Sequence, residues 1–285
     1  MATRGVTHHA SADAFLAAAE PLLARNAAVR VFVTAWVATW RDDPSSRPLV
    51  AATCAVDGAH GFALQREGPL VIDNSDPQAA AALAADLASR RVQVAHVIGE
   101  EPACAAFVAA WRAYVPCVAS AGMRMRHHML TALTELPPAP GLLRVAHEAD
   151  MPWLARHAQA FAREARLPDR PEDVRRSVRR RVRLRGVRLW VDGAARVAFA
   201  SVAIVGAADA RIGLVYTLPR HRGRGYATTL VGAMVRQCLG AGVQRVFLVT
   251  DLDNPTSNGV YARLGFRPVS DQVRIDLGPG ADVRA

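Results

Sequence analysis

A proline-rich segment divides this chain of 285 residues near its middle: Pro137-Pro138-Ala139-Pro140-Gly141. Prolines cannot continue a helix or supply N–H donors to a sheet, so neither kind of element is expected to cross this segment. The chain is also longer than one hydrophobic core usually supports. We therefore predict a globular protein of two domains, residues 1–136 and residues 142–285.

The apolar pattern predicts the same order of elements in both halves, namely a strand meander followed by helix, strand, helix and strand. In the first half we expect strands at 49–56, 61–64 and 70–72, a helix over 76–89, a strand over 92–98, a helix over 102–114 and a strand over 123–136. The corresponding ranges in the second half are 187–191, 197–204, 212–217, a helix to about 239, 245–250, a helix over 257–264, and a last strand near 273. This order predicts a mixed α/β fold with a partly parallel sheet. Residues 27–40 suit either a strand or a buried helix.

The positive charge of the chain is concentrated in its second half. The chain has no lysine, and residues 1–140 hold 11 arginines and 12 acidic residues, whereas residues 141–285 hold 24 and 13. Arginine is densest over 163–188, around an apolar stripe of Val174, Val178 and Val182. The second half should therefore attract an anionic partner, either a phosphorylated small molecule or a nucleic acid, while a solvated charged helix face remains the simpler interpretation of 163–188.

Other features of composition exclude several classes of protein. The first twenty residues hold scattered charges, and the apolar run at 27–40 is too short to cross a bilayer, so we expect a cytoplasmic protein that does not bind membranes. The four cysteines lack ligand-like spacing. The pairs His8-His9 and His127-His128 are expected at a terminus and on a strand surface, so we assign no metal.

An anion-binding loop is predicted where the strand over 212–217 meets the next helix. Gly223 and Gly225 allow positive φ and close approach of a ligand, and the helix that follows directs its free N–H groups toward the same space. Three arginines, Arg220, Arg222 and Arg224, add positive charge. The segment lacks the Lys-Ser/Thr pair of a P-loop and the third glycine of a dinucleotide fingerprint, and it suits a diphosphate.

A second segment lies about thirty residues further on, where a strand ends and a short helix begins. Asn254 or Ser257 caps that helix, Gly265 ends it before Phe266, and Tyr261 lies on the same helix face as Asn254 and Ser257.

Together the two segments resemble the GNAT superfamily of N-acetyltransferases over about 145 residues. The family's Arg/Gln-x-x-Gly-x-Gly/Ala signature is matched from Arg220 to Gly225, and its Asn, Tyr and Gly-Phe positions by Asn254, Tyr261 and Gly265-Phe266. The resemblance implies a GNAT fold for the second half and transfer of an acetyl group from acetyl-CoA, as co-substrate, to a primary amine by direct attack in a ternary complex. The amine would belong to a small molecule or a peptide.

The resemblance also implies roles for individual residues. Tyr261 would be the acid that protonates the departing thiolate, and Asp209 is a candidate base, although some family members use ordered water instead. The residues expected to bind coenzyme A are Val215, Tyr216, Thr217, Arg220, His221, Arg222, Gly223, Arg224, Gly225, Tyr226, Ala227, Asn254 and Ser257.

The first half has the same order of elements without these signatures. The equivalent loop reads Asp73-Asn74-Ser75-Asp76-Pro77, whose two carboxylates would repel a phosphate. We interpret residues 1–136 as a degenerate GNAT-like copy that has lost cofactor binding. Two other functions stay open: a non-catalytic coenzyme A sensor, in which Tyr261 would have no use, and an arginine-rich nucleic-acid-binding protein, which lacks aromatic residues among its arginines. The sequence does not determine the oligomeric state.

Overall fold

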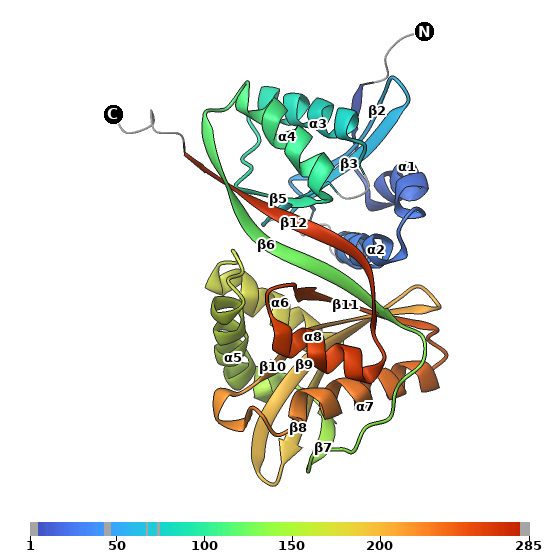
Figure 1. The fold of residues 1–285 in the computed structure, drawn as a ribbon, viewed down its shortest axis with the longest axis vertical. Coiled ribbons are helices and arrows are strands. Elements are labelled where there is room, and N and C mark those ends of the chain that lie inside the picture. Colours follow the sequence, from blue (N-terminus) through green and yellow to red (C-terminus); the bar gives the residue numbers. More distant parts are fainter. Residues whose placement is uncertain (1–4, 43–46, 67, 73–74, 280–285) are drawn as a thin grey trace. The chain divides into compact units, whose positions relative to one another are not determined.

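The computed structural model describes residues 5–42, 47–66, 68–72 and 75–279, and its elements repeat in one order (Figure 1). The first half contains β1 (Val6–His8), α1 (Ala12–Leu23), α2 (Ala27–Asp42), β2 (Val50–Val56), β3 (Ala59–Gln65), β4 (Leu70–Val71), α3 (Pro77–Ser89), β5 (His96–Gly99), α4 (Glu101–Arg112) and β6 (Cys117–Leu130). The second half contains β7 (Leu142–Val145), α5 (Met151–Glu164), α6 (Pro171–Arg183), β8 (Val187–Asp192), β9 (Ala195–Val205), β10 (Asp209–Thr217), α7 (Tyr226–Gly240), β11 (Arg245–Asp251), α8 (Pro255–Leu264) and β12 (Arg267–Pro279). The predicted mixed α/β fold is confirmed.

The largest difference from the predicted elements concerns β6 and the segment after it. The strand ends at Leu130, whereas the sequence pattern predicts strand as far as residue 136. Residues 133–140 instead follow α7 as irregular chain, because the Ala139 N–H donates to Thr229 Oγ1 (2.8 Å) and Trp190 Nε1 donates to the Pro140 carbonyl (2.8 Å). The ambiguous range at 27–40 is the helix α2.

The chain forms two compact units that exchange segments. One unit takes the described residues of Met1–Arg126, Asp251–Asp253 and Ser270–Ala285, and the other takes His127–Thr250 and Asn254–Val269. The predicted domains are continuous ranges, but each unit draws one strand or strand end from the other half of the sequence.

The first unit has a mixed sheet in the order β1-β2-β3-β4-β5-β12-β6. Helices α3 and α4 pack on one face, around Leu83 and Phe107, and α1 and α2 pack on the other, around Phe15 and Val33. Ser11 is the N-cap of α1, since its Oγ accepts from the Ala14 N–H (3.2 Å). Strand β12 completes this sheet by pairing antiparallel with β5, with Val273 opposite Gly99.

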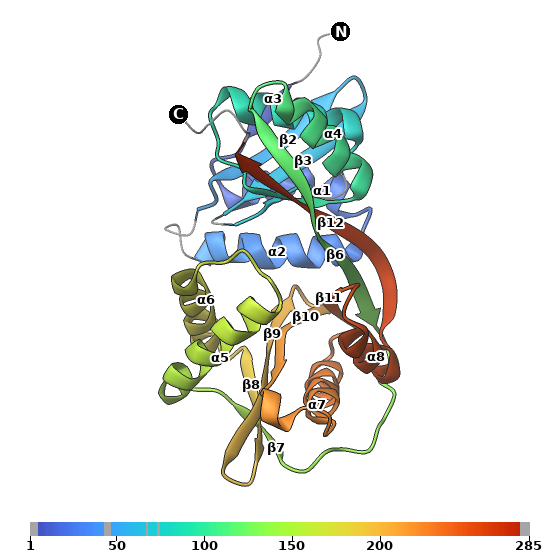
Figure 2. The same cartoon turned by 60° about the vertical axis from the view of Figure 1, so that its left-hand side comes forward.

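The second unit has the sheet order β6-β11-β10-β9-β8-β7, with the end of β6 as its first strand. Helices α7 and α8 cover one face, and α5 and α6 cover the other (Figures 1 and 2). The apolar stripe of α6 is buried, with Val178 only 1% exposed. The order β8-β9-β10 followed by α7, β11 and α8 places the two predicted site segments at the ends of neighbouring parallel strands, β10 and β11.

A buried carboxylate fixes the start of α5. Asp150 is only 2% exposed, and its oxygens accept from Arg144 Nη1 and Nη2 (both 2.8 Å), Arg196 Nη1 (3.1 Å) and the His147 N–H (3.0 Å). Burial acts to raise the pKa of Asp150, but the hydrogen bonds from Arg144 and His147 and the charges of these two residues lower it to about 2.

The exchange of strands makes the two halves of the sequence interdependent in folding. Fragments 1–140 and 141–285 should each be unfolded or aggregated when expressed alone, because each lacks a strand that completes its sheet. Co-expressed, they should form a soluble complex that co-purifies through a tag on one fragment. Cooperative thermal unfolding of fragment 141–285 by itself, followed by circular dichroism, would contradict this.

Asp150 should make stability depend on acid pH. Because its folded pKa is lowered, its contribution is present above the ordinary value of 3.8 and is lost as the pH falls toward 2. Linkage gives a loss of about 1 kcal/mol between pH 5 and pH 3 and about 2 kcal/mol by pH 2. Urea unfolding should show this slope for the wild type and for the control D173N, but not for D150N. Parallel curves for all three proteins would refute the assignment.

Candidate active site

The site is built on strands β10 and β11, which pair in parallel at their beginnings and then diverge. Their register joins Asp209, Ala210 and Arg211 to Arg245, Val246 and Phe247. Among the described residues no β10–β11 pair follows, although β10 continues to Thr217 and β11 to Asp251. The later peptide groups of β10 therefore have no strand partner on the β11 side.

A β-bulge lies in this unpaired part of β10. Gly213 pairs with Ser201 of β9 and Tyr216 pairs with Phe199, so β10 has one more residue than β9 between these two pairs. Leu214 lies inside the bulge with φ of 52°. A bulge redirects the peptide groups of a strand and is common next to active sites. Here it changes the direction of the peptide groups around Val215, where the resemblance predicts contact with pantetheine.

The loop after β10 has the conformation that an anion site needs. Gly223 and Gly225 adopt φ of 76° and 78°, and Gly225 is the N-cap of α7. The first N–H groups of α7 therefore have no helical partner, and the positive end of the helix dipole lies at this loop. The side chains of Arg220, Arg222 and Arg224 are exposed beside it.

Two buried polar atoms in this segment have no hydrogen-bond partner among the described residues: Thr217 Oγ1 and His221 Nδ1. Arg220 Nε lies 3.0 Å from His221 Nε2, and because arginine only donates, Nε2 is the acceptor and Nδ1 carries the ring proton. Burial, followed by the charges of Arg220 and Arg224, lowers the pKa of His221 and so favours the neutral ring. A buried hydroxyl and a buried N–H without partners suit the acceptor oxygens of a phosphorylated ligand such as coenzyme A.

The second predicted segment forms the start of α8. Asn254 is the N-cap, and its Oδ1 accepts from the Ser257 N–H (3.1 Å). This bond uses only the oxygen of the side-chain amide, so its N–H₂ group is available to a ligand. Gly265 ends the helix in the left-handed conformation as predicted.

Tyr261 lies in the middle of α8 and is buried. It is 7% exposed and packs edge-to-face on Phe266, with ring centroids 5.8 Å apart. It belongs to the apolar cluster against which Val215 of the bulge also packs. Its hydroxyl has no hydrogen-bond partner in the described part of the chain, and burial raises its pKa. Tyr261 is thus a protonated acid with a free O–H group.

Asp209, the predicted base, is held in an ion pair. Its two oxygens accept from Arg245 Nε (2.7 Å) and Nη2 (2.9 Å). It lies at the first residue of β10, six residues before Val215, in the part where β10 and β11 are still paired. The sequence pattern did not reveal this partner, because Arg245 is 36 residues away. We do not retain Asp209 as the base.

Three side chains of the predicted cofactor set are engaged within the protein. The Tyr216 hydroxyl donates to Glu164 Oε1 (2.6 Å), and the Tyr226 hydroxyl donates to Asp192 Oδ2 (2.5 Å). Arg222 Nη2 donates to Glu164 Oε2 (2.6 Å). Ligand contacts by Tyr216 and Tyr226 would therefore involve their backbone, as the resemblance predicts for the strand. Val215 and Ala227 present backbone groups at the bulge and in the first turn of α7.

Sequence reasoning missed Glu164 and a buried network behind α8. His128 Nε2 lies 3.1 Å from Thr250 Oγ1, which donates to Asn258 Oδ1 (2.6 Å). The prediction that His127 and His128 lie on a strand surface is wrong, since they are 1% and 4% exposed. Both faces of β6 are covered at this point, and polar residues at buried strand positions give no apolar signal in the sequence.

At the equivalent position in the first unit the two strands stay paired. Strands β4 and β5 pair to the end of β4, with Val71 opposite Ile98, and the Ile72 N–H donates to the Ile98 carbonyl (2.9 Å). The Asp76 carboxylate accepts from the His60 N–H (2.7 Å) and lies 3.4 Å from Arg25 Nη1. Asp73 and Asn74 lie outside the described residues. Among the described residues, the second unit has divergent strands and a glycine pair at this position, whereas the strands of the first unit stay paired.

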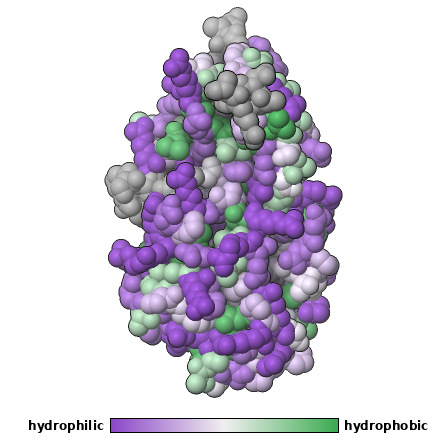
Figure 3. Space-filling view, turned by 90° about the vertical axis from the view of Figure 1, so that its left-hand side faces the viewer, coloured by the Kyte–Doolittle hydropathy of each residue, from purple (hydrophilic) through white to green (hydrophobic). Residues whose placement is uncertain are grey.

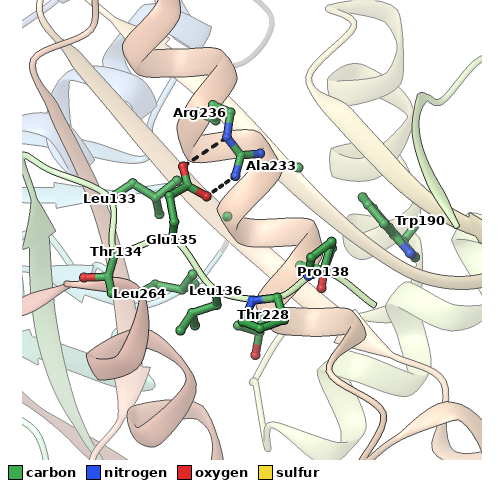
Figure 4. A pocket seen from close by; sticks show the side chains of 13 residues that line it. Leu133, Thr134, Glu135, Leu136, Pro138, Trp190, Thr228, Ala233, Arg236 and Leu264 are labelled. Carbon is green, nitrogen blue, oxygen red and sulfur yellow. Dashed lines mark hydrogen bonds and ion pairs between the residues drawn. The ribbon is translucent and has the colours of Figure 1, made fainter. Parts of the chain in front are cut away.

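A separate pocket lies between the segment after β6 and α7 (Figure 4). Leu133, Leu136 and Pro138 line one side, and Thr228 and Ala233 of α7 line the other. An ion pair between Glu135 and Arg236 closes one end. None of the predicted site residues lines this pocket, so it is not the predicted cofactor site.

The arginines of α6 face outward. Arg175, Arg176, Arg179 and Arg183 are exposed, opposite the buried valine stripe. Figure 3 shows the molecule from the side on which α5 lies in Figure 1, and hydrophilic side chains predominate on that face. Arg176 and Arg183 pair with Asp173 and Glu148, which agrees with a solvated charged face.

Among the residues that the structure describes, no group of three or more His, Cys, Asp or Glu side chains is placed to hold a metal ion. No described helix has the length and apolar character needed to span a membrane.

Comparisons with known proteins agree with this geometry. The sequence model of the acetyltransferase (GNAT) family matches residues 152–266. The matched range includes strand β10, the loop at Gly223 and helix α8, so this part of the chain is similar to the GNAT family. No curated protein matches the sequence.

Solved structures match the chain along almost its whole length. A Drosophila protein is 13% identical with a TM-score of 0.68, covering 98% of this chain and all of its own. A tandem GNAT protein from the clavulanic acid biosynthesis pathway is 18% identical with a TM-score of 0.60, covering 97% of this chain and 99% of its own. A GCN5-related N-acetyltransferase from Sphaerobacter thermophilus is 18% identical with a TM-score of 0.59, covering 98% and 97%. The whole chain therefore has the fold of a tandem GNAT protein.

Proposed function

We propose that this chain is an acyltransferase that moves an acetyl group from acetyl-CoA to a primary amine of a small molecule or peptide. The observation that carries the proposal is the bulged, unpaired end of β10 beside the loop at Gly223 and Gly225. Unpaired peptide groups suit an extended amide chain such as pantetheine, and the N-terminus of α7 suits a diphosphate.

The donor would be held by two groups of residues. The peptide groups of Val215 to Thr217 and the Asn254 amide would bind pantetheine, with Ser257 beside them. The loop from Arg220 to Gly225 and the first N–H groups of α7, at Tyr226 and Ala227, would bind the diphosphate. Arg220, Arg224 and the His221 ring N–H would supply its side-chain contacts, since Arg222 is paired with Glu164.

The reaction would proceed by direct attack in a ternary complex. The amine nitrogen forms a bond to the thioester carbonyl carbon, and the carbon–sulfur bond breaks as the tetrahedral intermediate collapses. An N–H group of the bulge would stabilise the oxyanion, and the Tyr261 hydroxyl would give its proton to the leaving thiolate. We assign removal of the amine proton to water, because Arg245 holds both oxygens of Asp209.

The proposal extends to partners and location as well. We infer a cytoplasmic enzyme without a resident metal, whose partners are the amine and the acyl donor and do not include nucleic acid or a membrane. The first unit would not bind coenzyme A, because β4 and β5 stay paired where β10 and β11 diverge.

The glycine loop provides the first test. Acetyl-CoA should bind with one equivalent per chain in isothermal titration calorimetry. At 100 times its Kd it should raise the free energy of unfolding by about 2.7 kcal/mol, and the melting temperature should rise with it. G223E should abolish both effects, because a carboxylate would repel the diphosphate. The matched control is G206E, since both glycines have positive φ, 76° and 62°, and neither has a neighbour within 4 Å of an added Cβ.

The outcomes separate the alternatives. Equal binding to G223E and wild type would place the donor elsewhere. Binding without turnover on any member of an amine panel would favour the non-catalytic coenzyme A sensor.

Tyr261 provides a test of the chemistry. Y261F should lower kcat by about 10²-fold and leave the KM for acetyl-CoA nearly unchanged, because the hydroxyl acts only on the leaving thiolate. Since burial raises its pKa, Tyr261 should stay protonated, and wild-type kcat should not fall up to about pH 10. A Y261F enzyme with full activity would remove Tyr261 from the mechanism.

A further inference from the structure

Glu164 is the last residue of α5, which lies on the sheet face opposite α7 and α8. From that face it contacts two residues of the proposed donor site. Its two oxygens serve different partners: Oε1 accepts from the Tyr216 hydroxyl (2.6 Å) and Oε2 accepts from Arg222 Nη2 (2.6 Å). Tyr216 is the residue at which β10 resumes pairing with β9 after the bulge, and Arg222 lies in the loop just before Gly223. One carboxylate therefore joins α5 to both parts of the donor site.

Arg222 completes a closed set of contacts. Its Nε donates to the Thr217 carbonyl (3.1 Å), and its guanidinium lies 5.3 Å from the centroid of the Tyr216 ring. Phe161, one turn earlier on α5, meets the same ring edge-to-face at 6.2 Å. The guanidinium is thus held by a carboxylate, a carbonyl and a ring, and this arrangement fixes the loop against the end of β10.

The charge states of Glu164 and Tyr216 favour both hydrogen bonds of the Glu164 carboxylate. Partial burial acts to raise the pKa of Glu164, but hydrogen bonds from Tyr216 and Arg222 and nearby arginine charge lower it overall. Burial and the bond to Glu164 raise the pKa of Tyr216 to about 12. At neutral pH Glu164 is therefore an anion and Tyr216 a donor, so both hydrogen bonds are charge-assisted.

Resting on the proposed function, we propose that Glu164 is a positioning residue for the acyl donor. Through Tyr216 and Arg222 it keeps the bulged strand end and the glycine loop in the shape that receives pantetheine and diphosphate. Arg222 then acts on the loop and not on the phosphate, although the sequence predicts it among the arginines that bind coenzyme A. The opposite behaviour, in which Glu164 competes with the diphosphate for Arg222, makes the opposite prediction for the same variants.

The experiment measures coenzyme A and acetyl-CoA binding to the full chain by calorimetry, together with steady-state kinetics. E164Q and Y216F should each raise the Kd of coenzyme A and the KM of the acyl donor about tenfold, as for loss of a hydrogen bond to a charged group. The kcat at saturating donor and the KM of the amine should stay within twofold. A structural role remote from the donor would not raise the Kd and KM of the donor while leaving kcat and the KM of the amine unchanged.

Two controls test for remote effects and for misfolding, and a double variant tests whether Glu164 and Arg222 act together. E135Q removes a carboxylate that pairs with Arg236 away from the loop and should bind like wild type. Thermal melting without ligand identifies any variant that fails to fold, and Y216F removes only one hydroxyl. The E164Q/R222Q double variant should bind no more weakly than either single variant, because the two residues act as one unit.

Each outcome decides the question. Tighter binding by E164Q would mean that Glu164 competes with the diphosphate, and unchanged binding would mean that the contact has no role in donor binding; either result overturns this inference and leaves the proposed function intact. A folded wild type that binds neither coenzyme A nor acetyl-CoA would overturn the proposed function and this inference with it.

Discussion

Peptide groups inside a β-sheet are normally paired on both sides, and the second unit departs from this rule where β10 leaves β11. Strand β10 follows β11 for three residue pairs and then leaves it, while the bulge at Leu214 turns the backbone on its other side. An unpaired peptide group away from water is costly, so such an opening needs solvent or a ligand of matching polarity. The loop, the cap of α7 and the start of α8 all lie at ends of these two strands.

The arrangement also distinguishes the two halves, although both have the same order of elements. In the first unit the pairing of β4 and β5 continues through Ile72, and the carboxylate of Asp76, at the start of α3, accepts from the His60 N–H. Both units keep the same order of elements while their strand ends differ, because the core of each unit is formed by helices packed on the sheet faces. Function follows the local geometry of two strands more than the topology around them.

Much of this could be predicted from the sequence. Alternating apolar residues, glycine at the turns and caps at Ser11 and Gly265 act locally, so the elements and the loop at Gly223 were predictable. Features that depend on partners distant in the chain were not. Asp209 resembles a base until Arg245 is seen beside it, and Arg222 resembles a phosphate ligand until Glu164 is seen. The burial of His127 and His128 and the early end of β6 likewise depend on what packs against them.

The exchanged strand β12 affects the order in which the protein can be completed during synthesis. Residues 1–126 leave the ribosome first, yet their sheet includes a strand whose last residue is Pro279. At bacterial or eukaryotic elongation rates, the roughly 150 intervening residues take about 10–30 s to make. During that time the edge of β5 has no β12 beside it. The half that is made first is therefore the half that is finished last. Until β12 is made, its unpaired strand edge is exposed to aggregation and is a site that chaperones can bind on the growing chain.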